Sequence, residues 1–316
     1  MDLPSNSLHV LMSRIIDYAG LYPPASLPLE EAIRNFVKHQ KDSDAWMLSR
    51  FVIPAKRLVE LSQLTELIFP PDRALSFSAL GRGGKNTAEF LENLKIDISD
   101  ILIFRDLHNA GVVIDMFETV LPATALIDPA ATLDLANKTT DSLNKNGLTV
   151  FYEAPFGEGW QKRAEKTIRC LRKIKDKHVG FKLRTGGVSA DAFPTPQQVA
   201  WAIAMTRDAG VPMKTTAGLH HPIRRYDATV ASKMHGFLNV FGAAVLAKTH
   251  TLPIEQIQNI LEDEDPASFV FDANGFTWKN LHADIEQIAH ARRDIVSFGS
   301  CSFDEPREDL HKIGLM

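Results

Sequence analysis

The feature that most limits the fold of this chain is a regular alternation of short apolar runs and amphipathic segments along its 316 residues. The apolar runs are rich in β-branched and aromatic residues, and the segments between them have helical spacing of apolar positions. The spacing of the runs leaves room for one crossover helix between successive strands. This pattern predicts a closed (β/α)₈ barrel, with an open doubly wound sheet as the alternative. The eight expected strands are 49–54, 74–80, 100–105, 123–128, 148–154, 179–184, 211–216 and 236–241.

The two ends of the chain fall outside these eight units. Residues 1–48 and 265–316 contain helical patterns, and we expect them to form N-terminal and C-terminal helical additions to a barrel over 49–264. No internal repeat or low-complexity linker separates the segments, so one domain is predicted. The helix expected before the strand 211–216 has an N-cap at Thr195 and a glycine just past its end.

The charge pattern argues against nucleic acid and membrane partners. The chain has 35 Lys and Arg against 39 Asp and Glu, scattered rather than clustered, and no window approaches 18 uninterrupted apolar residues. Cys170 and Cys301 are far apart and lack metal-ligand spacing, which argues against a disulfide framework and a structural zinc site. We therefore expect a cytoplasmic protein that binds a small anionic substrate, with self-association into a homo-oligomer left open.

Polar side chains late in apolar strands are the candidates for catalysis, because the active site of such a barrel lies at the C-terminal ends of its strands. Lys182 and Arg184 share one face of a strand, and Lys214 and Thr216 share one face of the next. If these cations converge, repulsion and burial should leave one lysine partly neutral, and a neutral amine attacks carbonyl carbon. Glu153 on the preceding strand would balance a charge or move protons. The structural alternative is that each lysine only rests its stem on the core.

Glycines directly after two of these strands predict a site for an anionic group. Gly186, Gly187 and Gly218 could offer backbone N–H groups to an anion, with Arg184 or Arg224 as the charge partner. The alternative is that they only allow tight turns. Asn239, in the last expected strand, is a weaker candidate for substrate binding.

Two adjacent histidines, His220 and His221, stand between Gly218 and Pro222. We expect at least one of them in the same pocket as the lysines, with His220 as an acid or base and His221 as a substrate contact. Together with Glu153 they would also form a three-ligand site for a divalent metal, which is the alternative. The preferred hypothesis needs no metal and no other cofactor.

Two segments resemble the deoxyribose-phosphate aldolases. "KTTAG" at Lys214 resembles the "KTSTG" motif of that family, and "GFKLRTGGV" at Lys182 resembles its "FKPAGGI" segment. The resemblance implies a class I aldolase on a (β/α)₈ barrel, in which one lysine forms a Schiff base and a neighbouring lysine lowers its pKa. The two segments occur in the reverse order in that family, so the motif assigns the imine to Lys214 and the strand position assigns it to Lys182. Segments such as "AGLYPPA" and "AGLHHP" also resemble a bacterial protein family, and that resemblance implies no function.

The sequence therefore predicts a cofactor-independent lyase or aldolase that acts on a small oxo-acid or sugar phosphate through a lysine Schiff base. Two alternatives remain open. One is a divalent-metal lyase that uses His220, His221 and Glu153, and the other is a non-catalytic barrel that binds a small anion.

Overall fold

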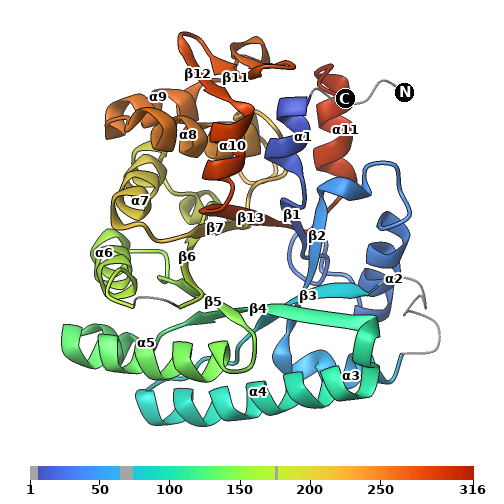
Figure 1. The fold of residues 1–316 in the computed structure, drawn as a ribbon, viewed down its shortest axis with the longest axis vertical. Coiled ribbons are helices and arrows are strands. Elements are labelled where there is room, and N and C mark those ends of the chain that lie inside the picture. Colours follow the sequence, from blue (N-terminus) through green and yellow to red (C-terminus); the bar gives the residue numbers. More distant parts are fainter. Residues whose placement is uncertain (1–5, 65–73, 175–176) are drawn as a thin grey trace.

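Eight parallel strands close into a barrel in a computed structural model that describes residues 6–64, 74–174 and 177–316 (Figure 1). The order around the barrel is β1, β13, β7, β6, β5, β4, β3, β2. The predicted (β/α)₈ barrel is therefore confirmed. The strands are β1 (Ile16–Tyr18), β2 (Leu48–Pro54), β3 (Leu75–Leu80), β4 (Val112–Val120), β5 (Thr149–Glu153), β6 (Val179–Arg184), β7 (Met213–Thr216) and β13 (Ile295–Ser300).

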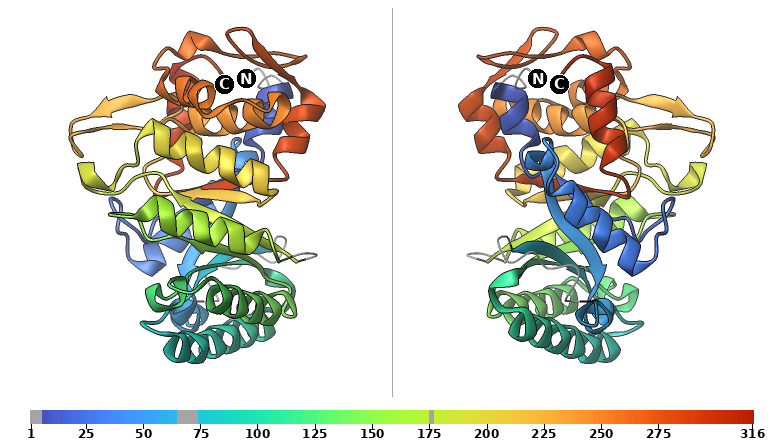
Figure 2. Two further views of the ribbon diagram at one scale, coloured as in Figure 1. Left: turned by 90° about the vertical axis from the view of Figure 1, so that its left-hand side faces the viewer. Right: turned by 90° about the vertical axis from the view of Figure 1, so that its right-hand side faces the viewer.

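The helices lie around the outside of this barrel (Figures 1 and 2). The α-helices are α1 (Asn6–Met12), α2 (Leu29–His39), α3 (Leu58–Ser62), α4 (Thr87–His108), α5 (Pro129–Asn144), α6 (Trp160–Leu171), α7 (Pro196–Ala209), α8 (Phe237–His250), α9 (Ile254–Glu262), α10 (Ile285–Ala291) and α11 (Asp304–Lys312). None of the helices in the described ranges is both long and apolar enough to cross a membrane. At α7 the expected end signals are present, since Thr195 and Gln198 form a capping box and Gly210 is left-handed.

The connection from β7 to β13 is the most elaborate one. It holds a two-stranded sheet, α8, α9, a three-stranded antiparallel sheet and α10. The five strands of these small sheets are β8 (Arg225–Asp227), β9 (Ser232–Met234), β10 (Phe269–Phe271), β11 (Gly275–Trp278) and β12 (Leu281–Asp284). The first described helix, α1, and the C-terminal helix α11 lie on this side of the molecule (Figures 1 and 2).

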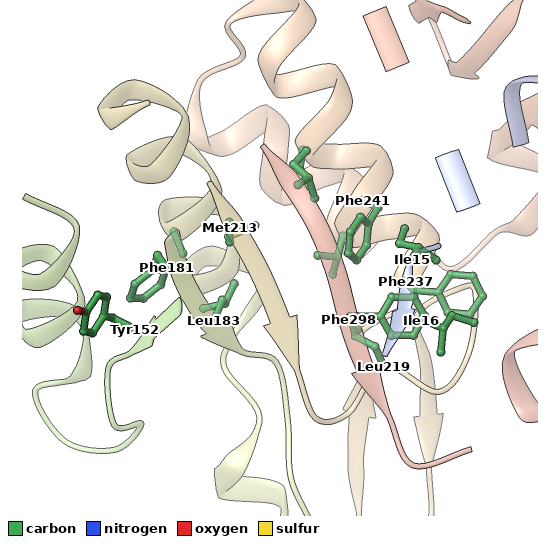
Figure 3. Packing of buried hydrophobic residues seen from close by; sticks show 14 of the residues in the cluster. Ile15, Ile16, Tyr152, Phe181, Leu183, Met213, Leu219, Phe237, Phe241 and Phe298 are labelled. Atoms are coloured by element: carbon green, nitrogen blue, oxygen red, sulfur yellow. The ribbon is translucent and has the colours of Figure 1, made fainter. Parts of the chain in front are cut away.

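The two faces of the central strands carry side chains of opposite character. Phe181, Leu183 and Met213 point outward and belong to the apolar core (Figure 3). Lys182 and Lys214 alternate with them and point inward, where they form ion pairs with other barrel strands. Because an unpaired charge in an apolar layer is costly, this alternation fixes which face of each strand lines the barrel interior.

One apolar run that was expected to be a strand, 100–105, lies in the long helix α4. Ile101 and Phe104 are buried, whereas Ile103 between them has 49% of its surface exposed. Burial at three-residue spacing is helical, and the run was wrongly interpreted because it is short and rich in β-branched residues.

Two further expected strands are also helical. The segment 236–241 begins α8, whose residues from Phe237 to Ala247 are all buried. A helix that is apolar on every side shows no 3.6-residue period and cannot be told from a buried strand by its pattern. The segment 123–128 is a 3₁₀ turn, followed by α5 with Asp128 as its N-cap.

Three barrel strands, β1, β4 and β13, were missed. β1 and β13 lie in the segments 1–48 and 265–316, so the barrel extends beyond the predicted limits of 49–264 at both ends. The two strands pair with each other in parallel and close the barrel. β1 has only three residues, and both β1 and β13 direct polar side chains inward, so neither reads as an apolar strand.

Candidate active site

A cavity of about 280 Å³ opens at the C-terminal ends of the barrel strands. The loops after β1 and β13 also contribute to its wall, through Tyr22 and Cys301 among others. Both cysteines of the chain are free thiols. Seven of the residues predicted from the sequence line this one cavity: Lys182, Arg184, Gly187, Lys214, Thr216, Gly218 and His220.

Lys214 lies at the buried end of the site, with only 1% of its surface exposed. Its Nζ is 2.8 Å from Asp17 Oδ2 on β1 and 2.5 Å from Glu118 Oε1 on β4. Asp17 Oδ2 also accepts a hydrogen bond of 2.6 Å from Ser297 Oγ on β13. A buried ammonium group requires such partners, so β1, β4 and β13 together hold Lys214 in place.

Lys182 shares one of these carboxylates. Its Nζ is 2.8 Å from Glu118 Oε2 and 3.0 Å from Glu153 Oε2. Glu153 in turn accepts a 2.9 Å hydrogen bond from Arg184 Nε, and Glu118 Oε1 accepts one of 2.6 Å from Ser78 Oγ. Glu153 does not line the cavity itself, and it supports two cations that do. The interior of the barrel therefore holds a continuous chain of alternating positive and negative groups.

The expectation that cation repulsion leaves a lysine partly neutral is wrong for Lys182. Burial lowers the pKa of Lys182, but the nearby carboxylates of Glu118 and Glu153 outweigh burial and raise the pKa above its ordinary value. Burial raises the pKa of Glu118, whereas Lys182 and Lys214 hold that pKa well below its ordinary range. Carboxylates separate the cations, so Lys182 is charged in the resting protein.

The glycines after β6 and β7 bring two loops into close contact. A Cβ atom on Gly218 would lie 2.8 Å from Gly186 Cα, and Gly218 has a φ of +75°. Both positions therefore need glycine for backbone packing, which favours the turn hypothesis over an open anion-binding concavity at this point.

We predict that Gly218→Ala lowers the free energy of unfolding by more than Gly210→Ala. Gly210 has a similar φ of +62°, but a Cβ atom there would meet nothing within 4 Å. Gly210→Ala should cost about 1–2 kcal/mol for the left-handed backbone alone, and Gly218→Ala should add the contact with Gly186. Urea denaturation of the two variants measures the difference. If both variants lost the same free energy of unfolding, the loops that contain Gly186 and Gly218 would be able to move apart without cost.

The two histidines diverge. His220 lines the cavity, as predicted for at least one of them, and its Nδ1 is 3.0 Å from Glu305 Oε2. His221 Nδ1 is 2.6 Å from Asp309 Oδ2 and faces a separate depression beside α11. His221 is therefore not a cavity residue, contrary to expectation.

The described residues do not bring the predicted metal ligands together. In the parts of the chain that the structure describes, no group of three or more His, Cys, Asp or Glu side chains is arranged to hold a metal ion. The predicted third ligand, Glu153, is held by Lys182 and Arg184 instead.

Asn239 has a structural role rather than the predicted one in substrate binding. It is fully buried on α8, where its Nδ2 donates to the carbonyls of Ile260 and Asp263 at 2.8 Å each. Its Oδ1 accepts from the backbone N–H of Arg224, also at 2.8 Å. It therefore joins α9 to the loop after β7 and does not line the cavity.

Sequence reasoning missed the acidic groups that organise the lysines. Asp17 lies in a segment that was expected to be helical, and Glu118 lies in the missed strand β4. The signal that could have located Glu118 is the apolar run "VVIDMFETV", because in a strand it would place Met116 and Glu118 on one face. No comparable signal marks Asp17, since β1 is too short to show a period.

The protein is therefore a parallel barrel in which two lysines share the carboxylate of Glu118, and all three residues line the cavity at the C-terminal ends of the strands. No protein-family model matches the sequence, and no curated protein matches it. Among solved structures, the chain is similar to deoxyribose phosphate aldolase from Aeropyrum pernix, which is described as having a unique tetrameric structure. The sequence identity is 15%, the TM-score is 0.45, and the match covers 69% of this chain and 86% of that one.

Proposed function

We propose that this protein is a lyase or aldolase that forms a Schiff base between Lys182 and the carbonyl group of a small oxo-acid or sugar phosphate. The observation that carries the proposal is the position of Lys182 in the cavity wall, between two carboxylates. Lys214 is less suited to the imine, because its side chain is only 1% exposed and is enclosed by Asp17, Glu118 and Met116. Its charge would instead help to set the proton affinity of Glu118.

Proton transfer must precede attack, because Lys182 is charged at rest. Glu118 and Glu153 each lie within 3.0 Å of its Nζ and are the available acceptors. After one of them takes a proton, the free amine adds to the carbonyl carbon, and the resulting carbinolamine loses water to leave a protonated imine. That imine accepts the electron pair of the carbon–carbon bond that breaks. The carboxylate, which has given its proton to the departing water, can then take the proton of the substrate hydroxyl group beside the bond that breaks and return it to the carbon that received the electrons.

Reductive trapping tests this proposal. The protein is incubated with small aldehydes and oxo-acids in the presence of borohydride, and the digested protein is examined by mass spectrometry. We expect a covalent adduct on the peptide that contains Lys182 and none on the peptide that contains Lys214. A control without carbonyl compound should give no adduct. Modification confined to exposed lysines such as Lys56 would favour the non-catalytic, anion-binding alternative.

A further inference from the structure

Two histidine–carboxylate pairs connect the loop after β7 to α11, and only one of them faces the cavity. His220 pairs with Glu305, and His221 pairs with Asp309 one helical turn further along α11. His220 lines the cavity that contains Lys182, whereas His221 lies beside a different depression. The first pair is therefore placed to contact a substrate, and the second provides a comparison with the same chemistry.

The contacts of His220 leave one ring nitrogen available. The carboxylate of Glu305 and the thiol of Cys301 both lie at Nδ1, at 3.0 Å and 4.0 Å, and Nε2 has no partner among the described residues. Burial lowers the pKa of His220, but Cys301 and Glu305 outweigh burial and raise the pKa to about 9. The carboxylate at Nδ1 therefore favours the protonated imidazole, which carries a second N–H group at Nε2.

Arg184 supplies a second donor on the same cavity. Its Nε is held by Glu153 at 2.9 Å, and its terminal guanidinium nitrogens have no partner in the described part of the chain. Arg184 and His220 follow different strands, and both line the cavity that contains Lys182.

The size and charge of the cavity indicate which anion fits. Its volume of about 280 Å³ lies just below the range for ligand sites, about 300–1,000 Å³. The charges around it balance, so the site lacks the excess positive charge that a phosphate dianion requires. Four cations that line the cavity pair with four carboxylates, of which only Glu118 lines it: Lys182, Arg184, Lys214 and His220 pair with Asp17, Glu118, Glu153 and Glu305.

We propose that His220, oriented by Glu305 and assisted by Arg184, binds the carboxylate of a short oxo-acid whose carbonyl group reacts with Lys182. The proposed function above supplies the position of the carbonyl group, and the inference rests on it in that respect. A carboxylate site at His220 favours the oxo-acid over the sugar phosphate as the substrate. Glu305 is then a positioning residue that acts through His220.

The test compares His220→Gln with His221→Gln as the matched control. Borohydride trapping at Lys182 is measured with pyruvate, propanal and glycolaldehyde phosphate. We expect His220→Gln to reduce pyruvate trapping about tenfold, because a hydrogen bond to a charged group is lost, and to leave propanal trapping unchanged. Glu305→Gln should reduce pyruvate trapping by a smaller factor, and His221→Gln should not reduce it. Thermal unfolding of each variant verifies that the fold persists.

Other results would overturn the inference. Three results would each show that His220 does not recognise a carboxylate. His220→Gln could reduce trapping equally with all three compounds, or reduce trapping with the phosphate compound alone. His221→Gln could also reduce pyruvate trapping as much as His220→Gln does. If the unaltered protein gives no adduct at Lys182 with any compound, the proposed function fails. An NMR titration with lactate, which cannot form an imine, then decides the carboxylate site separately. Weaker lactate binding in His220→Gln than in His221→Gln supports the site, and equal binding overturns it.

Discussion

Lys182→Met should reduce imine trapping and any lyase activity by about 10³-fold or more, because the substitution removes the attacking amine. Methionine keeps most of the length of the side chain. The fold should persist, since Glu118 keeps Lys214 as a partner and Glu153 keeps Arg184. Mass spectrometry of the trapped protein and circular dichroism measure the two effects together.

The matched control for this variant is Lys56→Met, which alters an exposed lysine outside the cavity. It should leave trapping at Lys182 unchanged. If Lys182→Met still forms the adduct at the original rate, the imine lies elsewhere. If Lys214→Met abolishes trapping while Lys182→Met does not, the roles of the two lysines are exchanged.

Glu118→Ala should lower the free energy of unfolding by about 3–5 kcal/mol, because it removes the carboxylate that two buried ammonium groups share. Ser78 Oγ would lose its acceptor as well. Asp134→Ala is the matched control, since Asp134 pairs with Lys138 at 2.7 Å on the exposed surface of α5. That surface pair should contribute less than about 1 kcal/mol.

Urea denaturation curves for these variants give the comparison. The free energy of unfolding of Glu118→Gln should lie between those of the unaltered protein and Glu118→Ala, because the amide oxygen still accepts one hydrogen bond but carries no charge. A loss in Glu118→Ala as small as that in Asp134→Ala would mean that water or neighbouring groups replace the carboxylate. The shared carboxylate would then have no large effect on stability.

The sequence carried enough information to predict the barrel and the lysine pair, because both depend on local periodicity. β6 is apolar on its outward face, so its alternation identified Lys182 and Arg184 as inward-facing residues. The helix α7 was equally clear, since its cap residues act locally. Properties of this kind are set by neighbours in the chain.

The partners of the lysines could not be predicted in the same way. Asp17 and Glu118 reach Lys214 from strands that are distant in the sequence, and nothing near either residue indicates that contact. The expectation of a neutral lysine was wrong for the same reason, because it counted only the cations visible on two adjacent strands. The pKa of Lys182 depends on the carboxylates that the closed barrel brings to it.

The pairing of β1 with β13 joins the first and last parts of the chain, and this has a consequence for synthesis on the ribosome. Until β13 has emerged, β1 and β7 both present open strand edges, and the nascent barrel is incomplete. Ser297 on β13 also supplies a hydrogen bond to Asp17, and Glu305 follows later still. The lysine site is therefore completed only after β13 has been made, so nascent chains that end before β13 carry Lys182 and Lys214 without their complete set of partners.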